Sequence, residues 1–174
     1  MFRQERDKSL FKWTMLGNVA EGRPNLGLTT DVSVYRLMQF TLRDTLIRKF
    51  DVAVADMVFY EAGKTAGAHF YEQLITKKET IGDFIEELQS LLKNLKIGIL
   101  RVEKANLDQM QFTLTVAEDL DCSGLPVCDE VICTYDEGFI AGLLSTHLQK
   151  DFQVKEVDCW CSGDRVCRFE VKPA

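Results

Sequence analysis

The spacing of apolar residues along the chain changes near Gly98. Before that glycine, apolar side chains recur every three or four positions, which is typical of helices with one buried face. Beyond it they alternate with polar side chains, which is typical of strands with one buried face. The pattern therefore predicts a helical half that precedes a sheet-forming half.

Three helices are predicted before Gly98. The first is expected over about 31–50 with Thr30 as its cap, and the second over about 55–74. The third begins at a capping box formed by Thr80 and Asp83, which satisfies exposed N–H groups at the helix start. The apolar stripe of the first helix comprises Tyr35, Met38, Leu42 and Leu46, and that of the third comprises Ile81, Phe84, Ile85, Leu88, Leu91, Leu92 and Leu95.

The second half of the chain contains two predicted hairpins separated by one helix. Strands are expected at about 99–103 and 110–116, a helix at about 136–149, and strands at about 152–161 and 165–171. Because strands and helices do not alternate regularly, we predict an α+β fold in which the helical half packs on an antiparallel sheet.

Glycine and proline residues interrupt any regular pattern near the N-terminus. We therefore predict a loose arm over 1–25 and a single domain over 26–174, with a cysteine-containing core over about 97–174. A chain of 174 residues that is 46% hydrophobic is long enough to bury one good core.

Charge and hydropathy argue against two classes of binding partner, nucleic acids and membranes. The chain has 21 basic and 27 acidic side chains and a formal charge of −6, which argues against a nucleic-acid partner. No apolar run approaches the roughly 18 residues that a membrane span needs, and the N-terminus is charged rather than signal-like. We therefore expect a cytoplasmic protein without a membrane partner.

Six cysteines all lie in the last third of the chain, in two clusters. A reduced protein with clustered thiols is more often a metalloprotein or redox protein than a disulfide scaffold. A metal site, a disulfide or redox pair, and unrelated buried thiols all remain open. The clusters are Cys122, Cys128 and Cys133, and Cys159, Cys161 and Cys167.

The second cysteine cluster lies on the last predicted hairpin. Cys159 and Cys167 each lie four residues from Gly163, so a symmetric turn would place them opposite each other. Directly opposed Cβ atoms are roughly 4.5–5.5 Å apart, which permits either a shared tetrahedral zinc or a disulfide. Cys161 would share the strand face of Cys159 and oppose Arg165. Spacing alone therefore does not decide between metal and disulfide.

The first cluster would complete a metal site of four thiolates, which is typical of structural zinc. Cys133 precedes the fourth predicted helix, and Cys122 enters the loop that leads to Cys128. Cys122 is the expected fourth ligand, and Cys128 is its main rival.

A small-residue pattern, Gly138-Phe-Ile-Ala-Gly142, lies in the fourth predicted helix. It leaves room either for close helix packing or for a ligand. If it leaves room for a ligand, an apolar pocket between the helices and the sheet would suit a hydrophobic or aromatic molecule. Its expected walls are Phe112, Leu114, Gly138, Phe139, Gly142 and Leu143.

From Cys122 onward the chain resembles the 4-vinyl reductase domain family. The most specific element is the pair of cysteines separated by seven residues, with Gly-Asp between them. The segment from Tyr60 to Gly67 is similar to what precedes this domain in archaeal members. The matching elements are Cys133, Gly138-Phe-Ile-Ala-Gly142, Glu156-Val-Asp-Cys159, Gly163-Asp164, Cys167 and Phe169-Glu-Val171.

The resemblance implies an α+β fold shared with subunits of the TRAPP vesicle-tethering complex and with sensor domains of phenol-responsive activators. It also implies a homodimer joined through the helical half. In those activators an aromatic effector occupies an apolar pocket beside a cysteine-ligated zinc. Carried over by motif, the zinc ligands here would be Cys122, Cys133, Cys159 and Cys167.

Three functions are compatible with the sequence. We favour a zinc-stabilised, non-enzymatic domain that binds a small molecule and acts through a partner. The alternatives are a component of an enzyme that reduces a vinyl group on a tetrapyrrole, and a protein–protein scaffold. No Gly-x-Gly-x-x-Gly motif is present to indicate a nicotinamide or flavin site.

Overall fold

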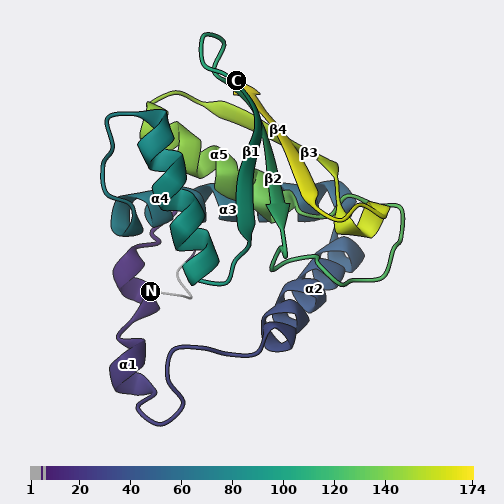
Figure 1. Cartoon of the computed structure of the whole chain (residues 1–174). Helices are drawn as coiled ribbons and strands as arrows, with labels where there is room; N and C mark the ends of the chain where they lie inside the picture. The colour runs from purple at the N-terminus through teal and green to yellow at the C-terminus, as the bar shows by residue number, and fades with distance from the viewer. Residues whose placement is uncertain (1–4, 6) are drawn as a thin grey trace.

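The computed structural model describes residue 5 and residues 7–174. Part of the predicted N-terminal arm, residues 1–4 and 6, lies outside the described residues. The fold is α+β, as predicted, with helices packed on a four-stranded antiparallel sheet (Figure 1). The elements are η1 (Trp13–Leu16), α1 (Val19–Gly22), α2 (Val32–Lys49), α3 (Val52–Leu74), α4 (Ile81–Asn94), β1 (Ile99–Asn106), β2 (Gln111–Ala117), α5 (Thr134–Leu148), β3 (Phe152–Asp158), η2 (Trp160–Ser162) and β4 (Cys167–Pro173).

Short polar side chains fix where the long helices begin. Thr80 caps α4, as predicted, because its hydroxyl oxygen accepts the N–H of Asp83 at 3.1 Å. The predicted cap of α2 at Thr30 is wrong by one residue, since the Asp31 carboxylate accepts the N–H of Ser33 instead. The second helix starts three residues earlier than predicted because Asp51 caps it by accepting from Val54.

The strand order is β1-β2-β4-β3, and every neighbouring pair is antiparallel. The strands of the last hairpin are shorter than predicted, since β3 ends at Asp158 and β4 begins at Cys167. Between them the chain forms the 3₁₀ turn η2 and passes through Gly163 at φ +100°, a conformation that favours glycine. Cys161 therefore lies in this turn, and its predicted place on a strand face is wrong.

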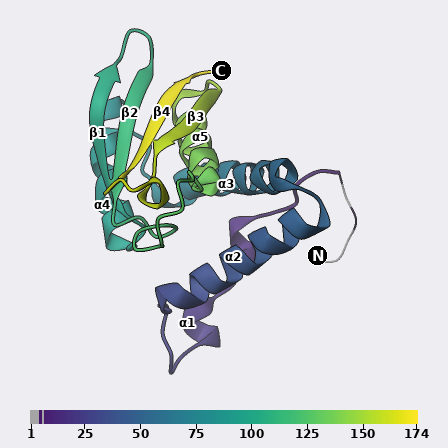
Figure 2. The ribbon, with the colours of Figure 1, turned by 90° about the vertical axis from the view of Figure 1, so that its right-hand side faces the viewer.

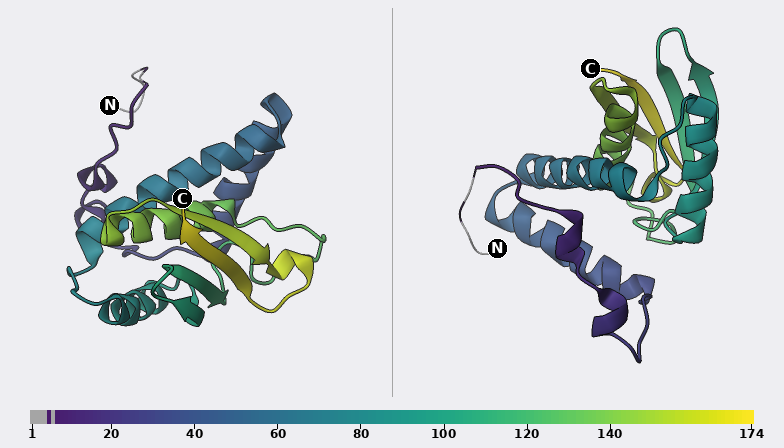
Figure 3. Two further views of the ribbon diagram at one scale, coloured as in Figure 1. Left: turned by 90° about the horizontal axis from the view of Figure 1, so that it is seen from above. Right: turned by 90° about the vertical axis from the view of Figure 1, so that its left-hand side faces the viewer.

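Helix α5 lies between the sheet and α3, and α4 packs beside β1 (Figure 3). The inner face of the sheet supplies most of the core, while its outer face carries polar side chains. The largest fully buried residues are Phe84, Phe152, Phe169, Leu143 and five cysteines.

Glycines bring α3 and α5 into backbone contact. A Cβ added at Gly138 or Gly142 would lie 2.0 or 2.1 Å from a carbonyl oxygen of α3, and a Cβ added at Gly67 would lie 2.1 Å from one of α5. No real Cβ approaches so closely. The small residues of both helices therefore serve close packing, one of the two roles that the sequence left open.

Helix α2 projects away from the sheet and contacts mainly α3 (Figure 2). None of its residues is buried. The N-terminal arm, with η1 and α1, runs beside it, and the predicted boundary near residue 25 stays a prediction. Among the described residues, no helix combines the length and hydropathy that crossing a membrane requires.

Candidate functional site

The structure brings the four predicted cysteine ligands together. Their sulfurs all lie within 4.8 Å of one another, and all four residues are buried. The Sγ–Sγ distances are 3.1 Å from Cys122 to Cys167, 3.8 Å from Cys133 to Cys159, and 3.9 Å from Cys133 to Cys167. These four residues could hold a metal ion.

Each ligand comes from the end of a different element. Cys122 follows β2, Cys133 is the residue before α5, Cys159 follows β3, and Cys167 begins β4. The site therefore ties the central sheet, the last hairpin and the start of α5 to one point.

Neighbouring side chains hold the backbone at three of the cysteines. The N–H of Cys133 donates to Glu156 at 2.9 Å, that of Cys122 to Asp119 at 3.1 Å, and that of Cys159 to Ser162 at 2.9 Å. Burial raises the pKa of Glu156 to about 8. These contacts fix where the sulfurs lie before any ion binds.

The cysteines of the cluster are free thiols. Even the shortest Sγ–Sγ distance, 3.1 Å, exceeds the roughly 2.05 Å of a disulfide bond. Hydrogen bonds between the thiols, those with Cys122 first, lower the pKa of Cys159 and raise the pKa of Cys133 and Cys167. The four thiols therefore titrate as one coupled group.

The two remaining cysteines lie apart from the cluster. Cys128, the rival of Cys122, is exposed. Cys161 is buried beside it, and its carbonyl accepts the N–H groups of Cys128 and Asp129. Burial raises the pKa of the Cys161 thiol to about 12. Neither residue belongs to the four-sulfur group.

Three acidic residues near the cluster were not predicted from the sequence. Burial raises the pKa of Asp119 to about 6 and that of Asp136 well above its ordinary value. Asp121 accepts hydrogen bonds from the Tyr35 hydroxyl at 2.8 Å and from Gln39 at 2.7 Å. Carboxylates in loops and in the first turns of helices are usually solvated, so only the folded chain reveals how far these are enclosed.

An apolar cavity lies between α4, α5 and the inner face of the sheet. Three predicted pocket residues, Leu114, Phe139 and Leu143, line it. Gly138 and Gly142 face α3 instead, where they contact its backbone. Phe112 borders a groove on the outer face of the sheet. The other apolar residues that line the cavity are Ile85, Leu88, Leu92, Ile97, Leu100, Val116, Ile140 and Leu144.

A second cavity, of about 340 Å³, lies under the N-terminal arm. Phe139 and Asp136 of α5 border both cavities. The arm, α2, α3 and α5 all contribute aromatic side chains to it. Its lining comprises Phe11, Trp13, Leu16, Tyr35, Ala66, His69, Phe70, Ile97, Leu120, Asp121, Tyr135, Asp136 and Phe139.

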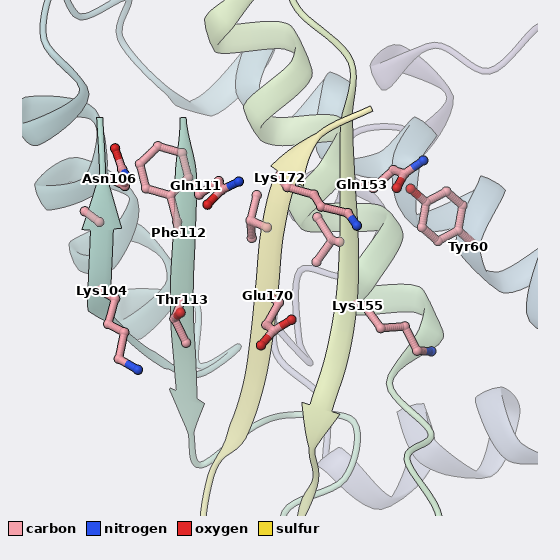
Figure 4. Close-up of a pocket in the computed structure, with 13 residues that line it drawn as sticks. Tyr60, Lys104, Asn106, Gln111, Phe112, Thr113, Gln153, Lys155, Glu170 and Lys172 are labelled. Carbon is pink, nitrogen blue, oxygen red and sulfur yellow. The ribbon is translucent and has the colours of Figure 1, made fainter. Parts of the chain in front are cut away.

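The outer face of the sheet forms a broad groove of about 830 Å³ (Figure 4). Lys104, Thr113, Glu170 and Lys155 lie across it, one on each strand. Three lysines, one glutamate and three amide side chains line this groove, so its charged groups are mainly basic.

Comparison with known proteins supports the resemblance in sequence. Residues 112–173 match the family model of the 4-vinyl reductase domain. The uncharacterized protein MJ1642 of Methanocaldococcus jannaschii is 28% identical over 147 residues, covering 84% of this chain and 80% of that protein. A second uncharacterized protein of that organism, MJ0150, is 29% identical over 117 residues, covering 67% of this chain and 64% of that protein.

Three solved structures share the fold at low identity. The phenol-responsive sensory domain of the activator PoxR, solved with phenol, has a TM-score of 0.65 at 14% identity and covers 84% of this chain and 76% of its own. A vinyl-4-reductase family protein from Methanocaldococcus jannaschii has a TM-score of 0.62 at 19% identity and covers 96% and 99%.

The third is a trafficking protein particle complex subunit 3 from Naegleria fowleri, covalently bound to palmitic acid. It has a TM-score of 0.65 at 14% identity and covers 82% of this chain and 95% of its own. The cysteine hairpin and the helix before it lie inside the segment that the family model matches. The comparisons therefore confirm the resemblance to the 4-vinyl reductase domain family, which the family model places at residues 112–173.

Proposed function

We propose that this chain is a zinc-stabilised domain that binds a hydrophobic or aromatic small molecule and acts through a partner protein. The observation that carries the proposal is the position of α5. Its first turn follows the ligand Cys133 and borders both cavities through Asp136, and its second turn borders both through Phe139. A shift of α5 on ligand binding would therefore reach the metal site directly.

The sulfur geometry fits zinc. In a tetrahedral site with Zn–S bonds of about 2.3 Å, two sulfurs lie about 3.8 Å apart. Two of the distances here are 3.8 and 3.9 Å, and the pair at 3.1 Å needs to open by only part of an ångström. Zinc bound by Cys122, Cys133, Cys159 and Cys167 would stabilise the fold and leave no position open for catalysis.

The cavity under the arm, of about 340 Å³, supports a small-molecule role, whereas the cavity between α4, α5 and the sheet, of about 40 Å³, is too small for an aromatic ligand. Apolar walls with a few polar groups are typical of ligand sites. The PoxR sensory domain was solved with phenol, and the Naegleria subunit carries palmitic acid. A protein of this fold can therefore hold an aromatic or an aliphatic molecule, and we propose the same class here, without catalysis of a reaction.

The exposed surface of helix α2 supports the existence of a partner, which we propose is a second copy of the chain. Its polar side chains point inward, since Arg36 donates to the carbonyls of Leu120 and Ser123. Its apolar side chains point outward, and Leu37 and Met38 are 66% and 64% exposed. Together with Val34 and Leu42, one helical turn either side, they form a face that a homodimer would cover.

Native mass spectrometry of protein purified without chelator and thermal-shift assays together test the proposal. By mass we expect a dimer with one zinc per protomer. In the thermal-shift assays we expect a gain in stability with a panel of apolar and aromatic compounds. Protein that contains no metal and does not take up added zinc would contradict the zinc site. A filled cluster with no response to any compound would favour the scaffold function, which the apolar face of α2 also supports.

We further propose that the protein is cytoplasmic, because a cluster of reduced thiols persists in a reducing compartment. The third function, a component of a vinyl-reducing enzyme, would require a cofactor to copurify with the chain.

A further inference from the structure

The cavity under the N-terminal arm is lined by many aromatic and two acidic side chains. Its walls include six aromatic residues besides His69, and two carboxyl groups, those of Asp121 and Asp136. Among the residues that the structure describes, neither lysine nor arginine lines it. His69, the one basic residue of the lining, lies 3.3 Å from Glu72. The cavity therefore combines aromatic surface with acidic groups that no permanent cation of the lining balances.

One of these carboxyl groups also lacks a hydrogen-bond donor among the described residues. The Oδ2 atom of Asp136 is buried and has no hydrogen-bond partner among the described residues. A carboxylate oxygen is an acceptor, and leaving a buried acceptor unpaired is costly. What the site lacks is thus a donor.

Arg36 of α2 does not supply that donor. Arg36 donates to the backbone carbonyls of Asp119, Leu120 and Ser123, so its guanidinium is already engaged. Asp121 has donors for both of its oxygens, from Tyr35 and Gln39. Among these carboxyl groups, Asp136 is the one that the chain leaves without a donor on the cavity wall.

We propose that this cavity binds an amine with an aromatic or aliphatic body, and that the ammonium group donates to the carboxylate of Asp136. The inference rests on the proposed small-molecule function and names the class of ligand. Aromatic walls attract a cation through their ring faces, and a charged hydrogen bond to a carboxylate is stronger than a neutral one. The apolar body would fill the space between Phe70, Phe139 and the arm.

Three probes of matched shape test the proposal. They are 3-phenylpropylamine, 3-phenylpropanol and butylbenzene, which present an ammonium, a hydroxyl and a methyl group at the same end. Binding is measured by isothermal titration calorimetry on the full chain loaded with zinc. We expect the amine to bind at least tenfold more tightly than either neutral probe.

Two variants locate the effect. Asp136→Asn should remove the preference for the amine and leave the affinity for the neutral probes within about twofold. Glu61→Gln removes the same charge from an exposed position on α3 and should leave the preference intact. Ala66→Leu, which fills the cavity from α3, should abolish binding of all three probes.

The possible results distinguish a preference for amines from ligand binding by the cavity in general. Equal affinity for all three probes, or an amine preference that survives Asp136→Asn, would overturn the amine inference and leave the cavity as a binding site. Binding of none of the probes by wild-type protein would overturn the inference together with the cavity's role in the proposed function.

Discussion

Helices α5 and α2 have similar lengths and opposite surroundings. Seven of the 15 residues of α5 are buried, whereas none of the 18 residues of α2 is. α5 lies between α3 and the sheet, and α2 makes few contacts with the rest of the chain (Figure 2). The core of the protomer thus lies around α5, whereas α2 presents an exposed apolar face, which is the surface that the proposed partner would cover.

The difference between α5 and α2 predicts that substitutions in the two helices have different effects. Changes around α5 should alter the stability of the protomer, because they act on its core and on the four-cysteine cluster. Changes on the outer face of α2 should alter association and leave the protomer folded.

The largest effect is expected from loss of a metal ligand. Cys159→Ser or Cys167→Ser should lower the free energy of unfolding by more than about 4 kcal/mol, because a structural metal contributes directly to folding. Urea denaturation with and without a chelator measures this. Cys161→Ser, also buried but outside the four-sulfur group, is the control and should cost far less. Equal losses for all three variants would mean that the cluster binds no metal.

The next largest effect is expected at the contact of α3 with α5. Gly142→Ala should destabilise the protomer by about 1–3 kcal/mol, because overpacking forces the helices apart. The matched control is Gly82→Ala in the first turn of α4. Its added Cβ meets only the hydroxyl oxygen of Thr80, at 3.8 Å, so this variant should be neutral or stabilised. Thermal unfolding of the two variants decides; a stable Gly142→Ala protein would show that the helices separate easily.

A smaller effect on stability, with a clear effect on assembly, is expected on α2. Leu37→Ser combined with Met38→Ser removes apolar side chains that are more than half exposed in the protomer. Burying each in a dimer contributes up to about 1.5–3 kcal/mol, so the double variant should dissociate to monomers. Light scattering measures the mass, and circular dichroism checks that the protomer stays folded.

Lys49→Ser, at the exposed end of the same helix, is the control for that experiment. It should leave the dimer intact. A wild-type protein that is monomeric at micromolar concentration would instead remove the homodimer from the proposed function, and another partner would have to cover this face.

The sequence revealed the core half more fully than the helical half. Periodicity predicted the order of the helices and strands, because one buried face leaves a clear pattern. It also predicted the cap at Thr80, which depends on local contacts alone. Cys159 and Cys167 could be named by resemblance, since their spacing on the hairpin is specific. These features depend on residues close together in sequence.

Features that depend on contacts between residues far apart in sequence were not predicted. The small residues of α5 did not reveal which neighbour they face, and the structure shows that Gly138 and Gly142 face α3. Burial of Asp136 arises from the packing of several elements around it, so no local pattern marks it. The periodicity of α2 revealed an apolar stripe but not what covers it, and Met38 and Leu42 of that stripe are exposed in the protomer.

The smallest effect is expected at the far end of α5, where His147 stacks on Phe84 of α4 with ring centroids 4.1 Å apart. Burial lowers the pKa of His147 below its ordinary value of 6.5. The unfolded chain therefore binds a proton more readily than the folded one, and this contribution to stability is present above pH 6.5 and is lost as the pH falls toward the folded pKa. Urea denaturation of wild type and His147→Phe should show it.

Other groups titrate in the same range, so the difference between the two proteins is the informative quantity. The raised pKa of Asp119, about 6, acts in the opposite direction, because burial stabilises its protonated form. Both proteins share that contribution. The stability of wild type relative to His147→Phe should therefore decrease between about pH 7.5 and about pH 5.5. A difference that stays constant with pH would mean that the imidazole is as free to take up a proton in the folded chain as in the unfolded one, and that this end of α5 packs more loosely than its centre.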